Sequence, residues 1–469
     1  MDTSTSPVIM RPVFGPSIKH ILASPSPLFE AIERHGGPLA IALPDEAQTA
    51  AEKFKALFEE LRMQSKVFVA HKATNSVDTL AALRSQVFID VASRAELAHA
   101  FSIGYTHDEI IATGPKSQHF LAELIAHDIP VCVDSHEELL RLRLLLANGL
   151  KDVKVLLRLT RSVLNMPSIT KRSRFGLDTA AYEKALAAIS EDKRFVLLGI
   201  SFHLDSQSAD ERYYAIMQAA KELIALQDKG YSASVLDIGG GYGAFYGINR
   251  SQVDRFEAGL KQAILDAGDT HTWQHFTYGL SRVGNAISGA LHGIDAPAGA
   301  IGVDRLREVL VRESAEGGTL ANFLNENLIE IWIEPGAAIL SEAGAVVTEI
   351  MEVKQLDGEI LVVVDAHRNQ VCFENNEALL DPILIKKHPE SSQASDVFIA
   401  GNLCAENDMM TYRKIRFDDV PRAGDLLLWT HTGAYRAHFS ASQAIGHALA
   451  KQLTYEENAN AYTLSERTS

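Results

Sequence analysis

The chain has 469 residues, of which 46% are hydrophobic and 22% are charged, and its formal net charge at pH 7 is −16. This length predicts two domains, and the negative charge disfavours a nucleic-acid partner, which requires clustered lysine and arginine. No apolar run approaches the roughly 20 residues that span a bilayer, and no signal peptide is recognisable, so no membrane partner is expected. Three cysteines, Cys132, Cys372 and Cys404, make no disulfide framework and favour a cytoplasmic, reducing location.

Between residues 66 and 335, short β-rich segments alternate with amphipathic helical stretches. The predicted strands are Val67–Ala70, Val87–Val91, Glu109–Thr113, Ile129–Val133, Val153–Leu159, Phe195–Leu204, Ser234–Gly239 and Leu328–Ile333. Several are apolar almost throughout, as strands buried on both faces are. Capping boxes at Ser93–Glu96 and Ser135–Glu138 each begin a helix directly after a strand. Eight strands alternating with helices predict a (β/α)8 TIM barrel, and their number favours closure over an open doubly wound sheet.

After Pro335 the pattern changes to strands joined by loops, with helix expected only from about Ser440. The strands predicted there are Ala345–Lys354, Glu359–Ala366, Pro382–Lys387, Asp396–Ala400 and Asp425–Thr430. This pattern is typical of an all-β domain, here a sandwich or a barrel-like sheet.

We therefore expect an N-terminal segment over 1–45, a barrel over 46–340 and a β-domain over 341–469. A strand-like stretch, Leu39–Leu43, joins either the barrel or the β-domain. Roughly 90 residues separate the last two predicted barrel strands. An excursion of that length needs structure of its own, so an insertion at 271–326 is expected to form a lid or an interface element.

Lys72 stands where a run of apolar, strand-forming residues stops and a small, polar, turn-prone segment begins. A partly desolvated lysine at this place has a lowered pKa, and its neutral amine forms a Schiff base with an aldehyde such as pyridoxal 5′-phosphate (PLP). Taken alone, Lys72 also fits a simpler interpretation, in which it marks the point where a strand meets solvent.

Other polar residues also fall at predicted strand ends, where a barrel gathers its reactive groups; Asp90 and Arg158 are two of them. His203 has a flat ring that can stack on an aromatic cofactor, or it is a hydrogen-bonded histidine at a strand end. The run Gly239–Gly241 leaves backbone N–H groups open to a phosphate, although a tight turn is the commoner reason for such a run. Glu334 can hydrogen-bond a pyridine nitrogen and keep it protonated, which makes pyridoxal an electron sink.

Several motifs occur together in one order along the chain. They are Ala70-His71-Lys72-Ala73-Thr74-Asn75, Asp90-Val91-Ala92-Ser93, Gly114-Pro115-Lys116, Phe202-His203-Leu204-Asp205-Ser206-Gln207, Gly239-Gly240-Gly241-Tyr242, Glu334-Pro335-Gly336, Gly401-Asn402-Leu403-Cys404-Ala405-Glu406-Asn407-Asp408 and Gly433-Ala434-Tyr435. With them, the chain from about Leu39 to Tyr435 resembles the fold-type III PLP-dependent decarboxylases, the group of ornithine, arginine and diaminopimelate decarboxylases. Alanine racemase is a more distant relative.

The resemblance implies a PLP-dependent amino-acid decarboxylase with a barrel of the alanine-racemase type. Lys72 would hold PLP as an aldimine, His203 would stack on the pyridine ring, and Cys404 would protonate the quinonoid carbanion after CO₂ leaves. The cofactor-binding residues that it implies are Lys72, Asp90, Arg158, His203, Ser206, Gly239, Gly240, Gly241, Glu334, Gly336 and Tyr435, and the substrate-binding residues are Glu406 and Asp408. In the family this cysteine reaches the neighbouring subunit's site, so a homodimer with shared active sites is expected. No metal is expected.

The chain departs from the family's pattern at several positions. Ala337 stands where the family has an arginine that helps to neutralise the phosphate, and Ala405 stands where an acidic residue commonly follows the cysteine. Asp205 replaces a glycine, and Arg436–Phe439 lacks the usual asparagine-containing pattern. These differences and the long insertion predict a changed substrate, which is an amino acid or a derivative such as a diamino acid. A PLP-dependent racemase or epimerase, a non-catalytic PLP-binding protein and a TIM-barrel hydrolase without PLP are the alternatives.

Overall fold

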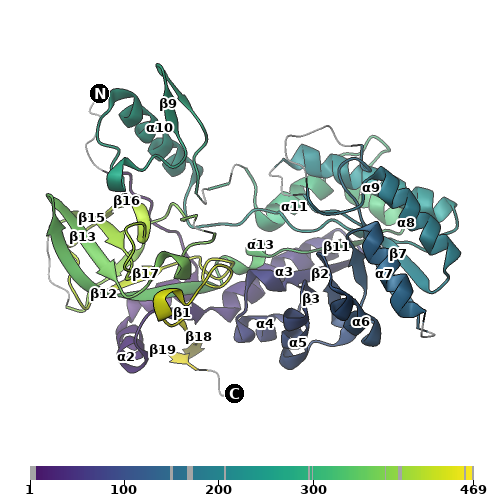
Figure 1. The fold of residues 1–469 in the computed structure, drawn as a ribbon, viewed down its shortest axis with the longest axis horizontal. Coiled ribbons are helices and arrows are strands. Elements are labelled where there is room, and N and C mark those ends of the chain that lie inside the picture. The colour runs from purple at the N-terminus through teal and green to yellow at the C-terminus, as the bar shows by residue number, and fades with distance from the viewer. Residues whose placement is uncertain are drawn as a thin grey trace. The chain divides into compact units, whose positions relative to one another are not determined.

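The structure is a computed structural model that describes residues 7–147, 151–165, 173–204, 208–293, 296–297, 299–374, 376–388, 393–458 and 461–466. The chain divides into two compact units (Figure 1). The barrel unit comprises Gln48–Ala244 and Gly299–Ile339, and the sheet unit comprises Met1–Ala47, Phe245–Ala298 and Leu340–Ser469. Across the described ranges, no helix is both long enough and apolar enough to cross a membrane.

Eight parallel strands close into a barrel in the order β11-β2-β3-β4-β5-β6-β7-β8. Their bounds are β2 Ser65–Ala70, β3 Phe88–Val91, β4 Ile110–Ala112, β5 Val131–Val133, β6 Val153–Arg158, β7 Phe195–Ser201, β8 Val235–Asp237 and β11 Glu330–Ile333. All eight predicted strands are present, and the prediction of a closed barrel is confirmed. One buried cluster takes Phe68, Ile111, Leu156 and Val235 from alternate strands, as the layers of a filled barrel interior do.

Helices alternate with the strands of the barrel unit, and most of them begin at a capping Ser, Thr or Asp, whereas the helix that begins at Gly302 follows Ile301 and has no side-chain cap. They are α3 Pro44–Glu60, α4 Val77–Leu83, α5 Arg94–Ile103, α6 Gln118–Ala126, α7 His136–Leu146, α8 Thr179–Glu191, α9 Ala209–Asp228, α11 Gly302–Leu310, α12 Leu320–Glu326 and α13 Ala337–Leu340, with 3-10 turns at η1 His71–Ala73 and η2 His107–Glu109. Ser93 and Ser135 cap α5 and α7, as predicted, by accepting the N–H of Glu96 and Glu138. Satisfied first-turn amides fix where each helix leaves its strand.

The sheet unit is built on a nine-stranded sheet, with β16-β15-β13-β12-β1-β18-β19 in order and β17 and β14 branching from β12. The bounds are β1 Leu39–Ala42, β12 Gly344–Leu356, β13 Glu359–Val364, β14 Ile383–Ile385, β15 Ser395–Ala400, β16 Met409–Phe417, β17 Leu426–Trp429, β18 Lys451–Asn458 and β19 Ala461–Ser465, with 3-10 turns at η4 Arg368–Gln370 and η5 Ala444–Gly446. The strand expected at Leu39–Leu43 is β1, which pairs with β12 and β18 and takes no part in the barrel.

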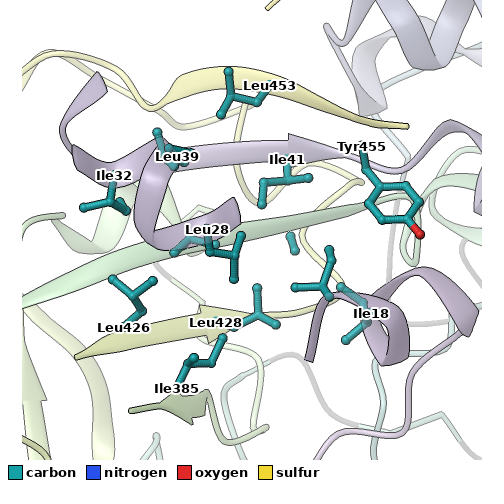
Figure 2. Packing of buried hydrophobic residues seen from close by; sticks show 14 of the residues in the cluster. Ile18, Leu28, Ile32, Leu39, Ile41, Ile385, Leu426, Leu428, Leu453 and Tyr455 are labelled. Atoms are coloured by element: carbon teal, nitrogen blue, oxygen red, sulfur yellow. The ribbon is translucent and has the colours of Figure 1, made fainter. Parts of the chain in front are cut away.

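Both faces of this sheet are buried, and alternate residues serve opposite faces. Leu39 and Ile41 of β1 pack with Leu426 and Leu428 of β17 under the helices α1 Pro16–Ala23 and α2 Ser26–His35 (Figure 2). The intervening residue of β17, Leu427, belongs to a second cluster with Val346 and Val362. Two hydrophobic layers therefore hold this sheet, which explains why its strands β1 and β17 are apolar throughout.

Two expectations differ from the structure. The expected insertion at 271–326 is not one body, because residues up to Ala298 belong to the sheet unit and α11 and α12 belong to the barrel unit. The sheet-unit part contains α10 Arg250–Asp266, η3 Trp273–His275 and the hairpin β9 Ser281–Val283 with β10 Ala286–Ser288. The helix expected after Ser440 was wrong, because β18 and β19 form there, and β18 extends the sheet beside β1.

Closure of the barrel requires a glycine at position 199, and this requirement can be tested. A Cβ atom at Gly199 in β7 would lie 1.8 Å from the carbonyl oxygen of Val235 in the paired strand β8, and backbone cannot yield as a side chain can. We expect Gly199→Ala to lower the free energy of unfolding by about 3 kcal/mol in urea titrations. Gly259→Ala is the matched control, because nothing lies within 4 Å of its added Cβ in helix α10. It should raise stability by about 0.5–1 kcal/mol; equal effects of the two substitutions would contradict this account.

Candidate active site

Predicted site residues lie at the carboxyl ends of six strands, at one end of the barrel. All eight strands are parallel, so their carboxyl ends lie together. The residues at or just beyond these ends are Lys72 after β2, Asp90 in β3, Arg158 in β6, His203 after β7, Gly239–Gly241 after β8, and Glu334 with Gly336 after β11. The side chain of Lys72 is exposed, so the expected partial desolvation of its amine is absent here. Ser206 lies outside the described residues.

Three carboxyl groups lie close enough at this end to influence one another electrostatically. Asp90 and Asp237 are buried, and Glu334 is half-buried. Asp90 accepts a hydrogen bond from Thr113 Oγ1 at 2.6 Å, and Asp237 accepts one from Ser201 Oγ at 3.1 Å. These neutral hydroxyl donors hold the carboxyl oxygens in place and bring no positive charge to offset ionisation.

Burial makes these carboxyls hold protons at unusually high pH. It raises the pKa of Asp90 to about 7, the negative charge of Glu334 adds to the rise, and the Lys72 ammonium opposes it. Burial also raises the pKa of Glu334 well above its usual value, and the charge of Asp237 adds to this effect. Burial raises the pKa of Asp237 to about 6, and a hydrogen bond with Glu334 limits this rise while adding to the rise in the pKa of Glu334. Glu334 is therefore the protonated donor of the pair, and Asp237 is the ionised acceptor.

His203 is a neutral ring at neutral pH. Its pKa is lowered to about 3, first because surrounding protein limits its hydration and then because Lys72, Arg158 and Arg212 place positive charge nearby. The side chain nevertheless keeps an exposed surface. Its Nδ1 atom accepts the N–H of Gly240 at 3.3 Å, so this ring is oriented against the glycine loop. A neutral ring held in this way suits packing against a flat ligand.

Each glycine of the loop is required by a close approach. A Cβ atom at Gly239 would lie 2.8 Å from Nδ1 of His203, one at Gly240 would lie 2.6 Å from the carbonyl oxygen of Glu334, and one at Gly241 would lie 2.3 Å from that of Leu204. Gly239 and Gly241 also have φ values of +63° and +78°, which favour glycine. The run is thus more than a turn, because it lets three strand ends converge.

Arg158 and Gly336 complete the predicted set in the barrel unit. The Arg158 guanidinium lies 3.6 Å from Asp134 and over the ring of Phe175, and its charge opposes the rise in the pKa of Glu334. Gly336 is buried directly before α13, and the helix begins at Ala337. The position at which an arginine was expected therefore carries only a methyl group.

The other predicted site residues belong to the sheet unit. Cys404 and Glu406 are exposed on the loop between β15 and β16, and their side chains are open to a ligand. Asp408, expected to bind substrate, is buried, and its carboxylate accepts N–H bonds from Arg368 and Leu403 at 2.9 Å each. This carboxylate is thus committed to holding the loop in shape, and it offers little to a substrate.

Tyr435 is half-buried after β17 and has a φ of +63°. Its ring packs against Phe373 and Phe439, with centroids 5.1 and 5.9 Å away. The two aromatic neighbours fix the ring direction and leave part of the side chain accessible.

Sequence reasoning missed two residues at the barrel end, Asp237 and Arg212. Asp237 ends β8 and pairs with Glu334, but an acid before a glycine run looks like ordinary turn chemistry. Arg212 lies within hydrogen-bonding distance of the glycine loop, and its side chain is fully buried. The sequence did hold one indication of its burial. Arg212 precedes Ala215, Ile216 and Ala219 at helical spacing, so it lies on the buried face of α9.

Comparison with known proteins gives one consistent result. Residues 47–274 match the family described as "Pyridoxal-dependent decarboxylase, pyridoxal binding domain". An uncharacterized protein, y4yA, of Sinorhizobium fredii is 28% identical over 96% of this chain and 94% of its own length. Diaminopimelate decarboxylase of Bacillus subtilis is 24% identical over 93% of this chain and 90% of its own length. The solved diaminopimelate decarboxylase from Helicobacter pylori, complexed with L-lysine, has the same fold, with a TM-score of 0.69 and 18% identity over 93% of this chain and 95% of its own.

The groups at the barrel end fit PLP chemically. The backbone conformation of the glycine loop suits a phosphate, and Lys72 has an exposed amine that could react with an aldehyde. The acidic pair formed by Glu334 and Asp237 would stabilise a protonated pyridine nitrogen, because a buried carboxylate lacks solvent compensation. His203 supplies a neutral ring.

The raised pKa of Asp90 predicts a specific pH dependence of stability. Because this pKa is higher in the folded than in the unfolded protein, ionisation of Asp90 opposes folding. The cost is absent below about pH 4, grows up to about pH 7 and is complete above it. Asp90→Asn keeps the acceptor for Thr113 and removes the charge. We expect it to stabilise the cofactor-free protein by up to about 4 kcal/mol at pH 8 and by little at pH 4, as measured by urea unfolding.

The matched control is Asp108→Asn, which removes the same charge from an exposed position. It should change stability little at either pH. If Asp90→Asn raises the free energy of unfolding equally at pH 4 and pH 8, ionisation of Asp90 does not oppose folding.

Proposed function

Because this chain is a divergent member of the fold-type III PLP-dependent decarboxylases, we propose that it removes the α-carboxylate of an amino acid or an amino-acid derivative, using PLP bound at Lys72. The observation that carries the proposal is the placement of Lys72, His203, Gly239–Gly241 and Glu334 at the same end of one closed barrel. These residues offer an amine, a neutral ring, an anion site and an acid, which are four complementary functions for a single ligand.

The barrel residues perform three tasks in the proposed reaction. When bound, PLP supplies an electron sink for the electron pair that the departing CO₂ leaves behind. Lys72 would hold the cofactor aldehyde through its amine and would release it when a substrate amine takes its place. Glu334 would give its proton to the pyridine nitrogen, and the positive charge formed there would offset the two carboxylate charges then left on Glu334 and Asp237. His203, which is neutral, orients the ring without competing for that proton.

Cys404 returns the proton that completes the reaction. Its exposed thiol would supply the Sγ proton to the substrate Cα in place of the lost CO₂. Cys404 and Lys72 belong to different compact units, and we propose that Cys404 acts in the barrel of a partner subunit. A homodimer with shared sites is then the smallest active assembly.

A diamino acid is the first substrate class to test. Glu406 lies two positions after Cys404 and is exposed, so its carboxylate is available to bind a distal ammonium group. Asp408 is excluded from this role by its burial and its backbone hydrogen bonds. The diaminopimelate decarboxylases among the relatives act on a substrate with two amino groups, as their name states.

Two alternatives use the same cofactor. A racemase or epimerase would return the proton to Cα without loss of CO₂, and a non-catalytic PLP-binding protein would do neither. A panel of L- and D-amino acids, including diamino acids, separates the three through CO₂ release and optical rotation. CO₂ release with a stable primary amine product supports the proposal, and loss of optical rotation without CO₂ supports the racemase.

The shared site predicts complementation between two inactive variants. Lys72→Ala removes the covalent attachment, and Cys404→Ala should lower the rate of CO₂ release by about 10²-fold or more, the usual contribution of a general acid. Mixing the two variants under exchange conditions should restore up to about a quarter of the wild-type rate, because half of the random dimers carry one intact site.

Cys372→Ala is the control for loss of a thiol, because Cys372 is buried within the sheet unit. This variant should retain decarboxylation. If the mixture of Lys72→Ala and Cys404→Ala stays inactive although the subunits exchange, Lys72 of one subunit and Cys404 of the other do not form a shared site.

A further inference from the structure

Among the described residues, Arg212 is one of two arginines in the group of largest fully buried side chains, with 0% exposure. It lies in the first turn of α9, which begins at Ala209 directly beyond the strand end that carries His203. An arginine is rarely buried to this extent, because removing a guanidinium from water is costly unless its environment provides compensation. Its burial at the barrel end therefore suggests that it has a function there.

The guanidinium of Arg212 is attached to the glycine loop. Its Nη2 atom donates to the carbonyl oxygens of Gly240 at 3.0 Å and Gly241 at 2.8 Å, and to that of Leu204 at 3.0 Å. The guanidinium also lies over the ring of Tyr242, 4.7 Å from its centroid. Arg212 thus fixes the loop from one side through two consecutive peptide groups.

Because peptide groups are planar, these contacts also determine where the N–H groups of the loop point. In a trans peptide the C=O and the following N–H point in opposite directions. Because the carbonyls of Gly240 and Gly241 point to Arg212, the N–H groups of Gly241 and Tyr242 point away from it. Within the described part of the chain, neither N–H has a hydrogen-bond acceptor. Positive φ at Gly239 and Gly241 on either side of Gly240 is typical of an anion-binding nest.

We propose that Arg212 is a positioning residue for the cofactor phosphate, holding the two amide donors toward it and placing a buried positive charge behind them. This inference rests on the proposed function, and it assigns to α9 a role that Ala337 cannot perform. The charge of Arg212 acts within the site, because it is one of the three cations that lower the pKa of His203. A phosphate with nearly two negative charges gains from a buried cation that solvent does not screen.

The test compares two ligands that differ only in the phosphate. Cofactor-free wild-type protein, Arg212→Lys and Arg212→Gln are titrated with PLP and with pyridoxal, and Kd is read from the absorbance of the Schiff base. We expect Arg212→Gln to lower the ratio of PLP to pyridoxal affinity by about 10- to 100-fold, because the charge is lost. Arg212→Lys keeps the charge and should retain most of the ratio, while pyridoxal affinity stays close to wild type in both variants.

Arg194→Gln is the matched control. Arg194 immediately precedes β7, so it lies at the opposite end of the barrel, where it binds Asp192 and the carbonyl oxygen of Leu146. This variant should leave the affinity ratio unchanged. Circular dichroism and thermal unfolding establish that each variant is folded, and if Arg212→Gln does not fold, Arg212→Lys and Arg212→Met are compared instead.

Three results would overturn the inference. They are an unchanged ratio in Arg212→Gln, a parallel loss of PLP and pyridoxal affinity, and equal losses of the ratio in the glutamine and lysine variants. The wild-type titration separates this inference from the proposed function. A wild-type protein that forms no Schiff base with PLP contradicts both, whereas strong wild-type discrimination that survives in Arg212→Gln contradicts the role of Arg212 alone.

Discussion

The interaction between the carboxyl groups of Glu334 and Asp237 favours a positively charged group in a ligand at this end of the barrel. The two carboxyl groups interact at the end of a closed barrel, and ionising both would place two poorly solvated negative charges side by side. One of them therefore keeps a proton, and Asp90 adds a third acid whose pKa is raised for the same reason. Such a group favours a ligand that brings a positive charge to it. A protonated pyridine nitrogen satisfies this requirement, whereas a second carboxylate or a phosphate would not.

The rest of the site follows from the closure of the barrel and the close backbone approaches that closure allows. Residues as distant in sequence as Lys72 and Glu334 reach one end because all eight strands are parallel. At that end the loop Gly239–Gly241 carries no side chains, so His203, Glu334 and Arg212 can lie against its backbone. The loop thus leaves backbone amides available to an anion at the end of the barrel that also carries the acids and Lys72. His203 and Arg212 are held against the loop by hydrogen bonds to its main chain.

Much of this organisation was predictable from local patterns. The eight barrel strands are apolar and each ends in polar residues, so both the fold and the rim residues Lys72, His203 and Glu334 could be predicted. Contacts between distant elements could not be predicted, because no local sequence pattern indicates which elements meet. Arg212 resembles any helical arginine until α9 is placed against the glycine loop, and Asp408 resembles a ligand-binding acid until its backbone partners are known. The strands after residue 450 were missed because β18 is specified by its pairing with β1, about 400 residues earlier.

Covalent attachment of PLP to Lys72 is the central claim, and borohydride reduction tests it most directly. The protein as purified is reduced, digested and analysed by mass spectrometry for a pyridoxyl-phosphate group on lysine. The account predicts one modified peptide, the one that contains Lys72. Lys66 and Lys116 serve as internal controls, because Lys66 lies on β2 itself and Lys116 is buried against Glu138. A reduced adduct on another lysine, or none on a protein that remains folded, would contradict the account.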